Sequence, residues 1–140
     1  VEILVACDPT KGKVMYLSVS YPGSKNDQSM MNMVDWESVL KGQFICTDKG
    51  FSGRYVVRKH QQYAGVNLSK KQLAENLEID GVRIIIENVF GWCCSKFAIC
   101  ASKLRFKTYH KKEGLQRLLN RHHIIWAIVL GLYNEISAVR

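Results

Sequence analysis

The spacing of apolar and polar residues divides the chain into strand-like and helix-like segments. Short apolar runs or strict alternation predict strands over residues 2–8, 13–21 and 43–47. The short connection between the first two predicts an antiparallel hairpin. Apolar residues at helical spacing predict helices over residues 28–40, 52–62, 70–100 and 111–139. This order of elements predicts an α/β fold with a mixed sheet.

Cap and turn residues mark the ends of several segments. Asn26 or Asp27 is expected to cap the helix over residues 28–40. Ser69 is expected to cap the helix over residues 70–100. Gly81 is a position where that later helix could break. For the basic segment 101–109 the sequence is consistent with either a strand or a loop. The core-facing stripe of the last helix is expected to comprise Leu115, Leu118, Leu119, His122, Ile125, Val129 and Leu132.

Length and composition indicate one globular domain, or a large part of one. The 140 residues are 47% hydrophobic and 23% charged. The chain opens at Val1 directly into a strand, which leads us to expect that an N-terminal segment is missing. Five cysteines, an odd number set in apolar runs, favour reduced thiols and an intracellular protein. The apolar run 123–133 is too short to span a bilayer, so no membrane span is expected.

Charge is distributed unevenly along the chain. Residues 1–48 hold four Lys/Arg and six Asp/Glu, whereas residues 96–121 hold eight Lys/Arg and one acid. This asymmetry suits an enzyme that holds cations in one place and a polyanion in another, although a merely basic protein would also show it. Within the basic helical end 96–140, the basic and aromatic segment 96–121 is a candidate phosphate-contacting face, with a solvated face as the alternative. Its candidate nucleic-acid contacts are Lys96, Lys103, Arg105, Lys107, Lys111 and Lys112.

Three acids lie at element ends or in apolar surroundings: Asp27, Asp48 and Glu87. Carboxylates from distant positions hold Mg²⁺ or Mn²⁺, because hard cations prefer oxygen ligands. Two such ions about 4 Å apart activate a nucleophile and stabilise the leaving oxygen of a phosphodiester. Each acid also has a simpler interpretation: Asp27 as a helix cap, Asp48 as a turn residue, and Glu87 as the i+4 partner of Arg83. A glutamate buried among isoleucines would need a partner.

Zinc binding has little support in the sequence. The candidate ligands are Cys93, Cys94 and Cys100 with His110, His122 or His123. Their spacing matches no common pairing of zinc ligands.

Several short motifs follow one another in a specific order. They are Cys7-Asp8, the Pro-Gly-Ser-x-x-Asp loop at 22–27, Asp48-Lys49-Gly50-Phe51, the set Asn76, Arg83, Glu87 and Phe90-Gly91, Lys96-Phe97, and Leu132-Tyr133-Asn134. Over nearly the whole chain this order resembles the Harbinger-type (PIF) transposase nuclease, a DDE-type catalytic domain with an RNase H-like fold.

The resemblance implies an RNase H-like mixed sheet flanked by helices and lacking its first strand, so that residues 1–140 form a partial nuclease domain. It implies that Asp48 and Glu87 are the second and third catalytic carboxylates, and that Asp27 is an additional metal ligand. Arg83 would join the catalytic set by orienting Glu87 and a phosphate. The first catalytic aspartate would lie on a strand upstream of Asp8. A lysine usual after the family's glutamate falls at Cys94 here, which leaves Lys96 as the nearest base.

The function implied is a DNA endonuclease or transposase domain dependent on Mg²⁺ or Mn²⁺, nuclear in a eukaryote, and assisted by a separate DNA-binding protein. Two alternatives remain. One is a catalytically inactive, transposase-derived module that binds DNA or protein. The other is an RNase H-like nuclease that acts on another nucleic acid.

Overall fold

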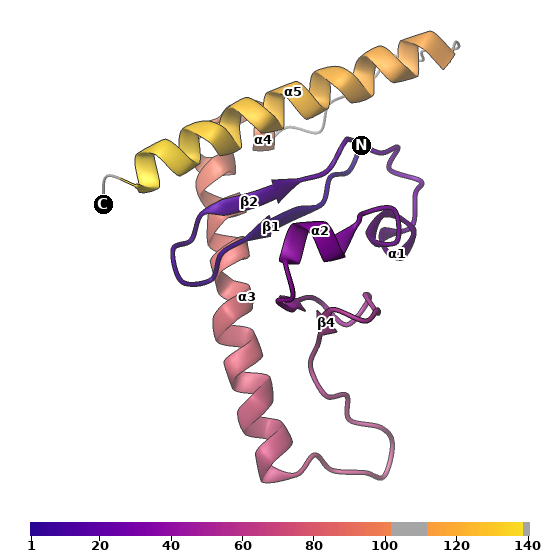
Figure 1. Ribbon diagram of the computed structural model, residues 1–140, viewed down its shortest axis with the longest axis vertical. Coiled ribbons are helices and arrows are strands. Elements are labelled where there is room, and N and C mark those ends of the chain that lie inside the picture. The colour runs from indigo at the N-terminus through magenta and orange to yellow at the C-terminus, as the bar shows by residue number, and fades with distance from the viewer. Residues whose placement is uncertain (102–111, 139–140) are drawn as a thin grey trace.

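The chain combines two small sheets with three short and two long helices in the part that the structure describes. This computed structural model describes residues 1–101 and 112–138 (Figure 1). The elements are β1 (Val5–Cys7), β2 (Val14–Leu17), α1 (Asp27–Met31), α2 (Trp36–Leu40), β3 (Ile45–Cys46), β4 (Val56–Val57), α3 (Lys70–Lys96), α4 (Ala98–Ala101) and α5 (Lys112–Ser137). The predicted mixed α/β class is confirmed.

The hairpin predicted at the start of the chain is present, with shorter strands. β1 and β2 pair antiparallel, with Val5 opposite Leu17 and a bulge after Ala6. The carboxylate of Asp8 accepts hydrogen bonds from the amide and hydroxyl of Thr10, at 2.8 and 2.6 Å, and so closes the turn.

The prediction of a helix over residues 52–62 is wrong. Those residues contain β4, which pairs parallel to β3. The Ile45 amide donates to the carbonyl of Tyr55 at 2.8 Å, and the Thr47 amide to that of Val57 at 3.0 Å. Two adjacent β-branched valines favour this extended conformation over a helix. The described strands therefore form two separate two-stranded sheets, not the single mixed sheet expected.

The helix predicted over residues 28–40 is divided in two. α1 ends at Met31, and α2 begins at Trp36. Asp35 starts the second helix because its carboxylate accepts hydrogen bonds from the amide and hydroxyl of Ser38, at 3.4 and 2.6 Å. Lys41, with a φ of 48°, adopts a left-handed conformation and ends α2.

The long helix α3 begins where the sequence predicts and continues without a break at Gly81. Ser69 and Gln72 form a reciprocal capping box at its N-terminus. Its 27 residues span about 40 Å at the usual rise of an α-helix. It ends at Lys96, earlier than expected, because Phe97 is extended, and α4 follows as a separate turn.

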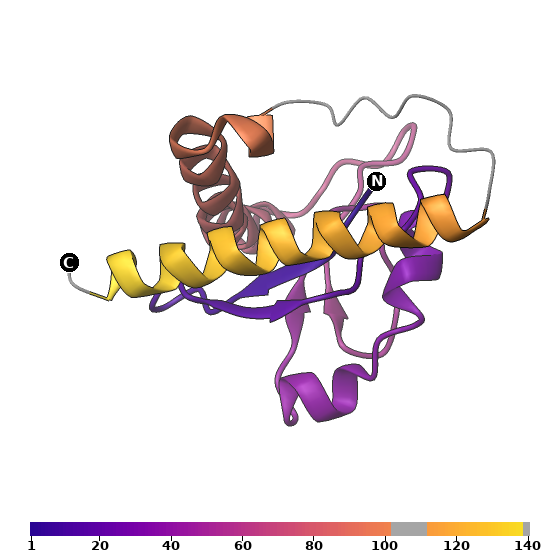
Figure 2. The same cartoon turned by 90° about the horizontal axis from the view of Figure 1, so that it is seen from above.

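The hydrophobic core lies where α3, α5 and the hairpin meet. Its buried members are Val89 and Cys93 of α3 with Trp126, Val129 and Leu130 of α5. α5 runs along the β1–β2 hairpin, and the C-terminal end of α3 approaches both (Figure 2).

The buried face of α5 matches the predicted stripe in part, because His122 and Val129 are buried. Trp126 and Leu130 are buried, whereas Leu115 and Leu132 are exposed. Trp126 packs edge-on against Phe90 of α3, with ring centroids 5.6 Å apart. None of the helices in the described part of the chain is both long and apolar enough to cross a bilayer.

Candidate functional site

Asp48 lies two residues after the end of β3 and opens a tight turn. Its carboxylate accepts a hydrogen bond from the amide of Lys49 at 2.7 Å, and its carbonyl accepts one from the amide of Phe51 at 3.2 Å. The side chain is 60% exposed. Asp48 thus has the turn role that the sequence allowed, while its carboxylate stays accessible from solvent.

Arg83 and Glu87 are one turn apart on α3 and form the ion pair that their spacing predicts. A guanidinium nitrogen of Arg83 lies 3.5 Å from the Glu87 carboxylate. Glu87 is 63% exposed, so the expectation of a carboxylate buried among isoleucines is wrong. The helical period turns this position toward solvent, as it does the neighbouring Ile84.

Arg83 also reaches Asp48, and so joins two acids that are 39 residues apart in the sequence. Its other terminal nitrogen lies 3.8 Å from the Asp48 carboxylate. Both separations exceed those of direct hydrogen bonds, so these are ion pairs. Arg83 itself is only 25% exposed, which fixes the cation between two accessible carboxylates. The group of three side chains carries a formal charge of −1.

Asp27 is the first residue of α1, and the residue before it is the N-cap. The side chain of Asn26 is the N-cap and accepts a hydrogen bond from the amide of Gln28. The Gln28 side chain donates to the carbonyl of Ser52 and accepts from its amide, at 2.9 and 2.7 Å. The start of α1 is therefore tied to the loop that follows Asp48.

The three predicted metal ligands are only partly brought together. Arg83 joins Asp48 and Glu87, whereas Asp27 shares no described hydrogen bond or ion pair with either. Within residues 1–101 and the described part of α5, no group of three or more His, Cys, Asp or Glu side chains is placed to hold a metal.

The donor chemistry at Asp48 and Glu87 nevertheless fits a hard divalent cation. Both side chains offer carboxylate oxygens, the ligands that Mg²⁺ and Mn²⁺ prefer, and both are more than half exposed. The guanidinium of Arg83 offsets one of the two negative charges, and the remaining net charge of −1 favours a cation beside the two carboxylates.

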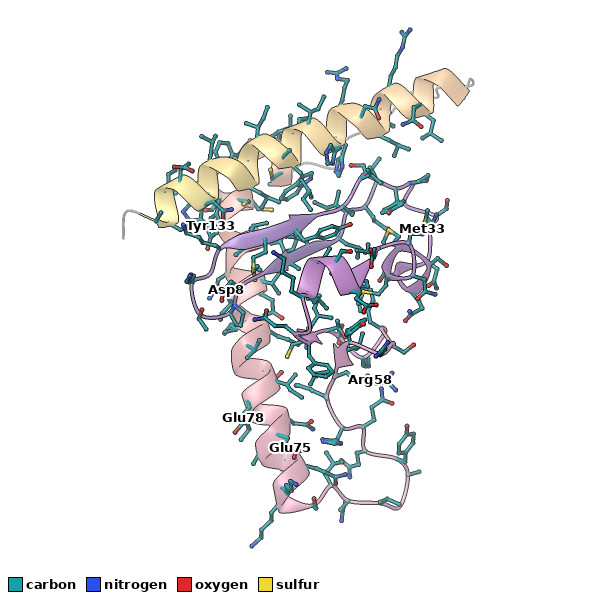
Figure 3. All side chains as sticks on the ribbon, viewed as in Figure 1. Asp8, Met33, Arg58, Glu75, Glu78 and Tyr133 are labelled. Carbon is teal, nitrogen blue, oxygen red and sulfur yellow. The ribbon has the colours of Figure 1, made fainter. Side chains whose placement is uncertain are left out.

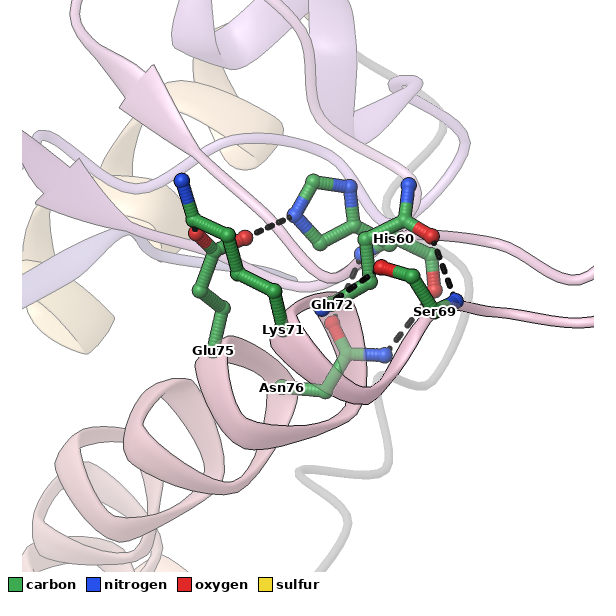
Figure 4. A network of polar contacts seen from close by, with 6 residues as sticks. All are labelled: His60, Ser69, Lys71, Gln72, Glu75 and Asn76. Carbon is green, nitrogen blue, oxygen red and sulfur yellow. Dashed lines mark hydrogen bonds and ion pairs between the residues drawn. The ribbon is translucent and has the colours of Figure 1, made fainter.

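Asn76 is a motif residue for which the sequence suggested no role. Its side-chain oxygen accepts from the backbone amide of His60 at 2.8 Å, and its nitrogen donates to the His60 carbonyl at 3.1 Å (Figure 4). The imidazole of His60 lies 2.6 Å from the carboxylate of Glu75. These contacts fasten the chain after β4 to the first turns of α3.

The basic face predicted at the end of α3 falls largely outside the described residues. Lys96 is the last residue of α3, 13 residues beyond Arg83, or about 20 Å along the axis. Lys103, Arg105, Lys107 and Lys111 lie outside the described residues, as does the side chain of Lys112.

The thiols near the end of α3 have the character of buried core groups. Cys93 is fully buried, and this burial, with the nearby Cys100 and Cys94, raises the pKa of its thiol to about 11. The Cys94 thiol donates to the carbonyl of Cys100 at 3.6 Å.

Comparison with known proteins gives one family match. A family model described as DDE superfamily endonuclease matches residues 1–134. Searches of curated proteins and of solved structures returned no match.

Proposed function

The chain belongs to the DDE superfamily endonuclease family, and from this premise we propose that it contributes to metal-dependent cleavage of DNA phosphodiester bonds. The observation that carries the proposal is the meeting of Asp48 and Glu87 at Arg83. Carboxylates from a strand end and a helix, accessible to solvent and sharing one cation, have the chemistry of a metal-assisted phosphoryl-transfer site.

In this proposal Asp48 and Glu87 hold Mg²⁺ or Mn²⁺, with Asp27 as a further oxygen ligand. A divalent cation held there would supply the charge that activates water and stabilises the leaving oxygen. Arg83 is a positioning residue that holds the two carboxylates on the same side of α3. In the family pattern that the motifs resemble, a further catalytic carboxylate completes the set with Asp48 and Glu87.

The same proposal includes an RNase H-like sheet completed by another strand. β1 and β3 belong to different sheets, and both contact α3. Ile45 and Thr47 direct their amides toward β4, so the amide of Cys46 points to the opposite edge of β3. We propose that this edge pairs with a further strand of the sheet.

The finer assignments rest on the motif resemblance. We assign the chain to the Harbinger-type (PIF) branch, with DNA as substrate and a separate DNA-binding protein as partner. In a eukaryotic cell such an enzyme acts in the nucleus.

A matched set of isosteric variants tests the proposed site. Asp48→Asn and Glu87→Gln, made in the full natural chain, should lower Mn²⁺-dependent cleavage of plasmid DNA by more than about 100-fold. Loss of a direct ligand should exceed the 10–100-fold typical of its outer partners. The same variants should weaken Mn²⁺ binding, measured by titration calorimetry or by the paramagnetic signal of free Mn²⁺.

Glu78→Gln is the control, because Glu78 is an exposed acid on the same helix outside the site (Figure 3). It should leave both cleavage and Mn²⁺ affinity unchanged. Cleavage that is equal in all four proteins would sink the assignment of Asp48 and Glu87. DNA binding without cleavage by the unchanged chain would favour the catalytically inactive module instead.

A further inference from the structure

The chain between Asp48 and Glu75 carries positive charge alone. Residues 49–74 contain six Lys/Arg and no Asp/Glu, in a sequence with 12 acids. Four of these cations lie in or next to the β3–β4 unit and form a group that we name the β3–β4 basic surface: Lys49, Arg54, Arg58 and Lys59. The phosphate-contacting charge predicted from the sequence lies elsewhere, at residues 96–112.

This surface is held in place by contacts to the rest of the fold. Arg58, just after β4, approaches the carbonyls of Lys49 and Phe51, at 3.5 and 3.4 Å, and so ties the end of β4 to the first half of the β3–β4 loop, residues 47–55. Lys59 forms an ion pair with Asp80 of α3. Figure 3 shows Arg58 beside β4, with Glu75 and Glu78 on the N-terminal half of α3.

Two of the four cations are available to a ligand. Lys49 and Arg54 are exposed, and neither forms an ion pair with a described residue. The guanidinium of Arg54 lies 5.4 Å from the ring centroid of Tyr55, a cation–π contact that favours one orientation of the side chain.

The surface adjoins the candidate metal site. Lys49 follows Asp48 and donates its amide to the Asp48 carboxylate at 2.7 Å. Asp48 in turn meets Arg83. Lys96, the nearest described member of the other basic face, is about 20 Å from Arg83 along α3. A phosphate bound near Asp48 therefore lies closer to the β3–β4 basic surface than to Lys96.

We propose that Lys49 and Arg54 bind the backbone phosphates of DNA next to the scissile bond. This inference rests on the proposed function and adds to it the surface that holds the substrate. Two exposed cations on a fastened loop neutralise phosphates with little loss of loop entropy. Their contribution is independent of sequence and sensitive to salt, because it comes from counterion release.

The test compares two variants in which the same amount of positive charge is removed. Lys49→Gln/Arg54→Gln alters the proposed surface. Lys11→Gln/Lys13→Gln alters two lysines at the tip of the hairpin, where Gly12 lies beside Tyr133 of α5. Binding of the full chain to a 30-base-pair duplex is followed by fluorescence anisotropy across a salt series, with EDTA present so that no cleavage occurs.

The Lys49→Gln/Arg54→Gln variant should reduce the slope of log affinity against log salt by about 2, since each neutralised phosphate contributes about 0.9. At 0.1 M salt its affinity should fall roughly 8-fold for each phosphate that is no longer neutralised. The hairpin variant should keep the slope of the unchanged chain, and both variants should keep its urea midpoint.

Equal slopes for the two variants would overturn this inference and leave the cleavage test untouched. No binding by the unchanged chain would overturn both this inference and the proposed action on DNA.

Discussion

Arg83 shows how a single side chain joins parts of the candidate site that come from different elements. Its two carboxylate partners are mostly exposed, and exposed ion pairs contribute about 0–1 kcal/mol. Its pairing therefore does little for the stability of the fold. What it contributes is position and charge, so changes at Asp48 or Glu87 should report on chemistry with little effect on folding.

His122 is the residue whose protonation matters most for the core. The indole N–H of Trp126 donates to its Nε2 at 3.1 Å, so Nε2 is an acceptor and the imidazole is neutral. Nδ1 then carries the proton and donates to the hydroxyl of Ser20 at 2.7 Å. Both His122 and Ser20 are buried. Protonation of Nε2 would break the bond to Trp126 and place a charge in the core.

We expect the stability of the protein to fall in mild acid for this reason. Burial lowers the pKa of His122 below its usual 6.5, so the unfolded chain takes up the proton first as pH falls. The contribution of the neutral imidazole is complete above pH 6.5 and decreases as pH falls below it toward the folded-state pKa. Urea midpoints at pH 7.5 and 5.5 should show this loss.

A His122→Gln variant is the control for that measurement. It should be less stable at pH 7.5 but should lose less stability between pH 7.5 and 5.5 than the unchanged chain. If the two proteins lose stability in parallel, another group governs the acid response.

At the scale of elements, each long helix has an asparagine whose side chain bonds both backbone polar groups of one residue in another segment. Asn134 of α5 accepts from the amide of Val14 and donates to its carbonyl, both at 2.8 Å. Asn76 of α3 makes the same pair of bonds to His60. The first clamp docks α5 on the hairpin and is partly buried, whereas the second fastens an exposed segment.

Removing the two clamps should have unequal effects. Asn134→Ala leaves an amide and a carbonyl of Val14 without partners in a half-buried place, which should cost about 1–3 kcal/mol of unfolding free energy. Asn76→Ala should cost less than about 1 kcal/mol, because water replaces its exposed bonds. Urea unfolding of both variants measures the difference, and the reverse order would show that burial does not set the strength of these clamps.

The sequence predicted those elements in which a periodic pattern of apolar and polar positions extends over many residues. The hairpin and the long helices α3 and α5 follow from periodicity, and the Arg83–Glu87 pair follows from helical spacing. β4 was missed because a two-residue strand has no period of its own and depends on its partner. The contact of Arg83 with Asp48, and the Asn134 clamp across 120 residues, depend on how elements dock, which local patterns do not encode.

At the scale of the whole molecule, α3 spans two regions of different physical character. Its C-terminal half supplies Val89 and Cys93 to the core shared with α5 and the hairpin (Figure 1). Its N-terminal half exposes Leu73 and Leu77 and meets the chain after β4 through exposed polar contacts. Ile79 is the buried apolar residue of this half, so the N-terminal end relies more on ion pairs and hydrogen bonds than the C-terminal end does.

This division should appear in hydrogen exchange. Amides of residues 85–95, the hairpin and α5 should be the most protected, because their opening requires disruption of the core. Amides of residues 70–82 and the β3–β4 unit should exchange faster. Raising NaCl from about 0.05 to 1 M should increase exchange only in the second group, since salt screens the exposed pairs of Asp80 and Glu75 but leaves apolar burial intact.

Asp80→Asn should reproduce the effect of salt near residue 59. Uniform protection along α3, insensitive to both salt and Asp80→Asn, would show that the helix and the β3–β4 unit open as one body with the core.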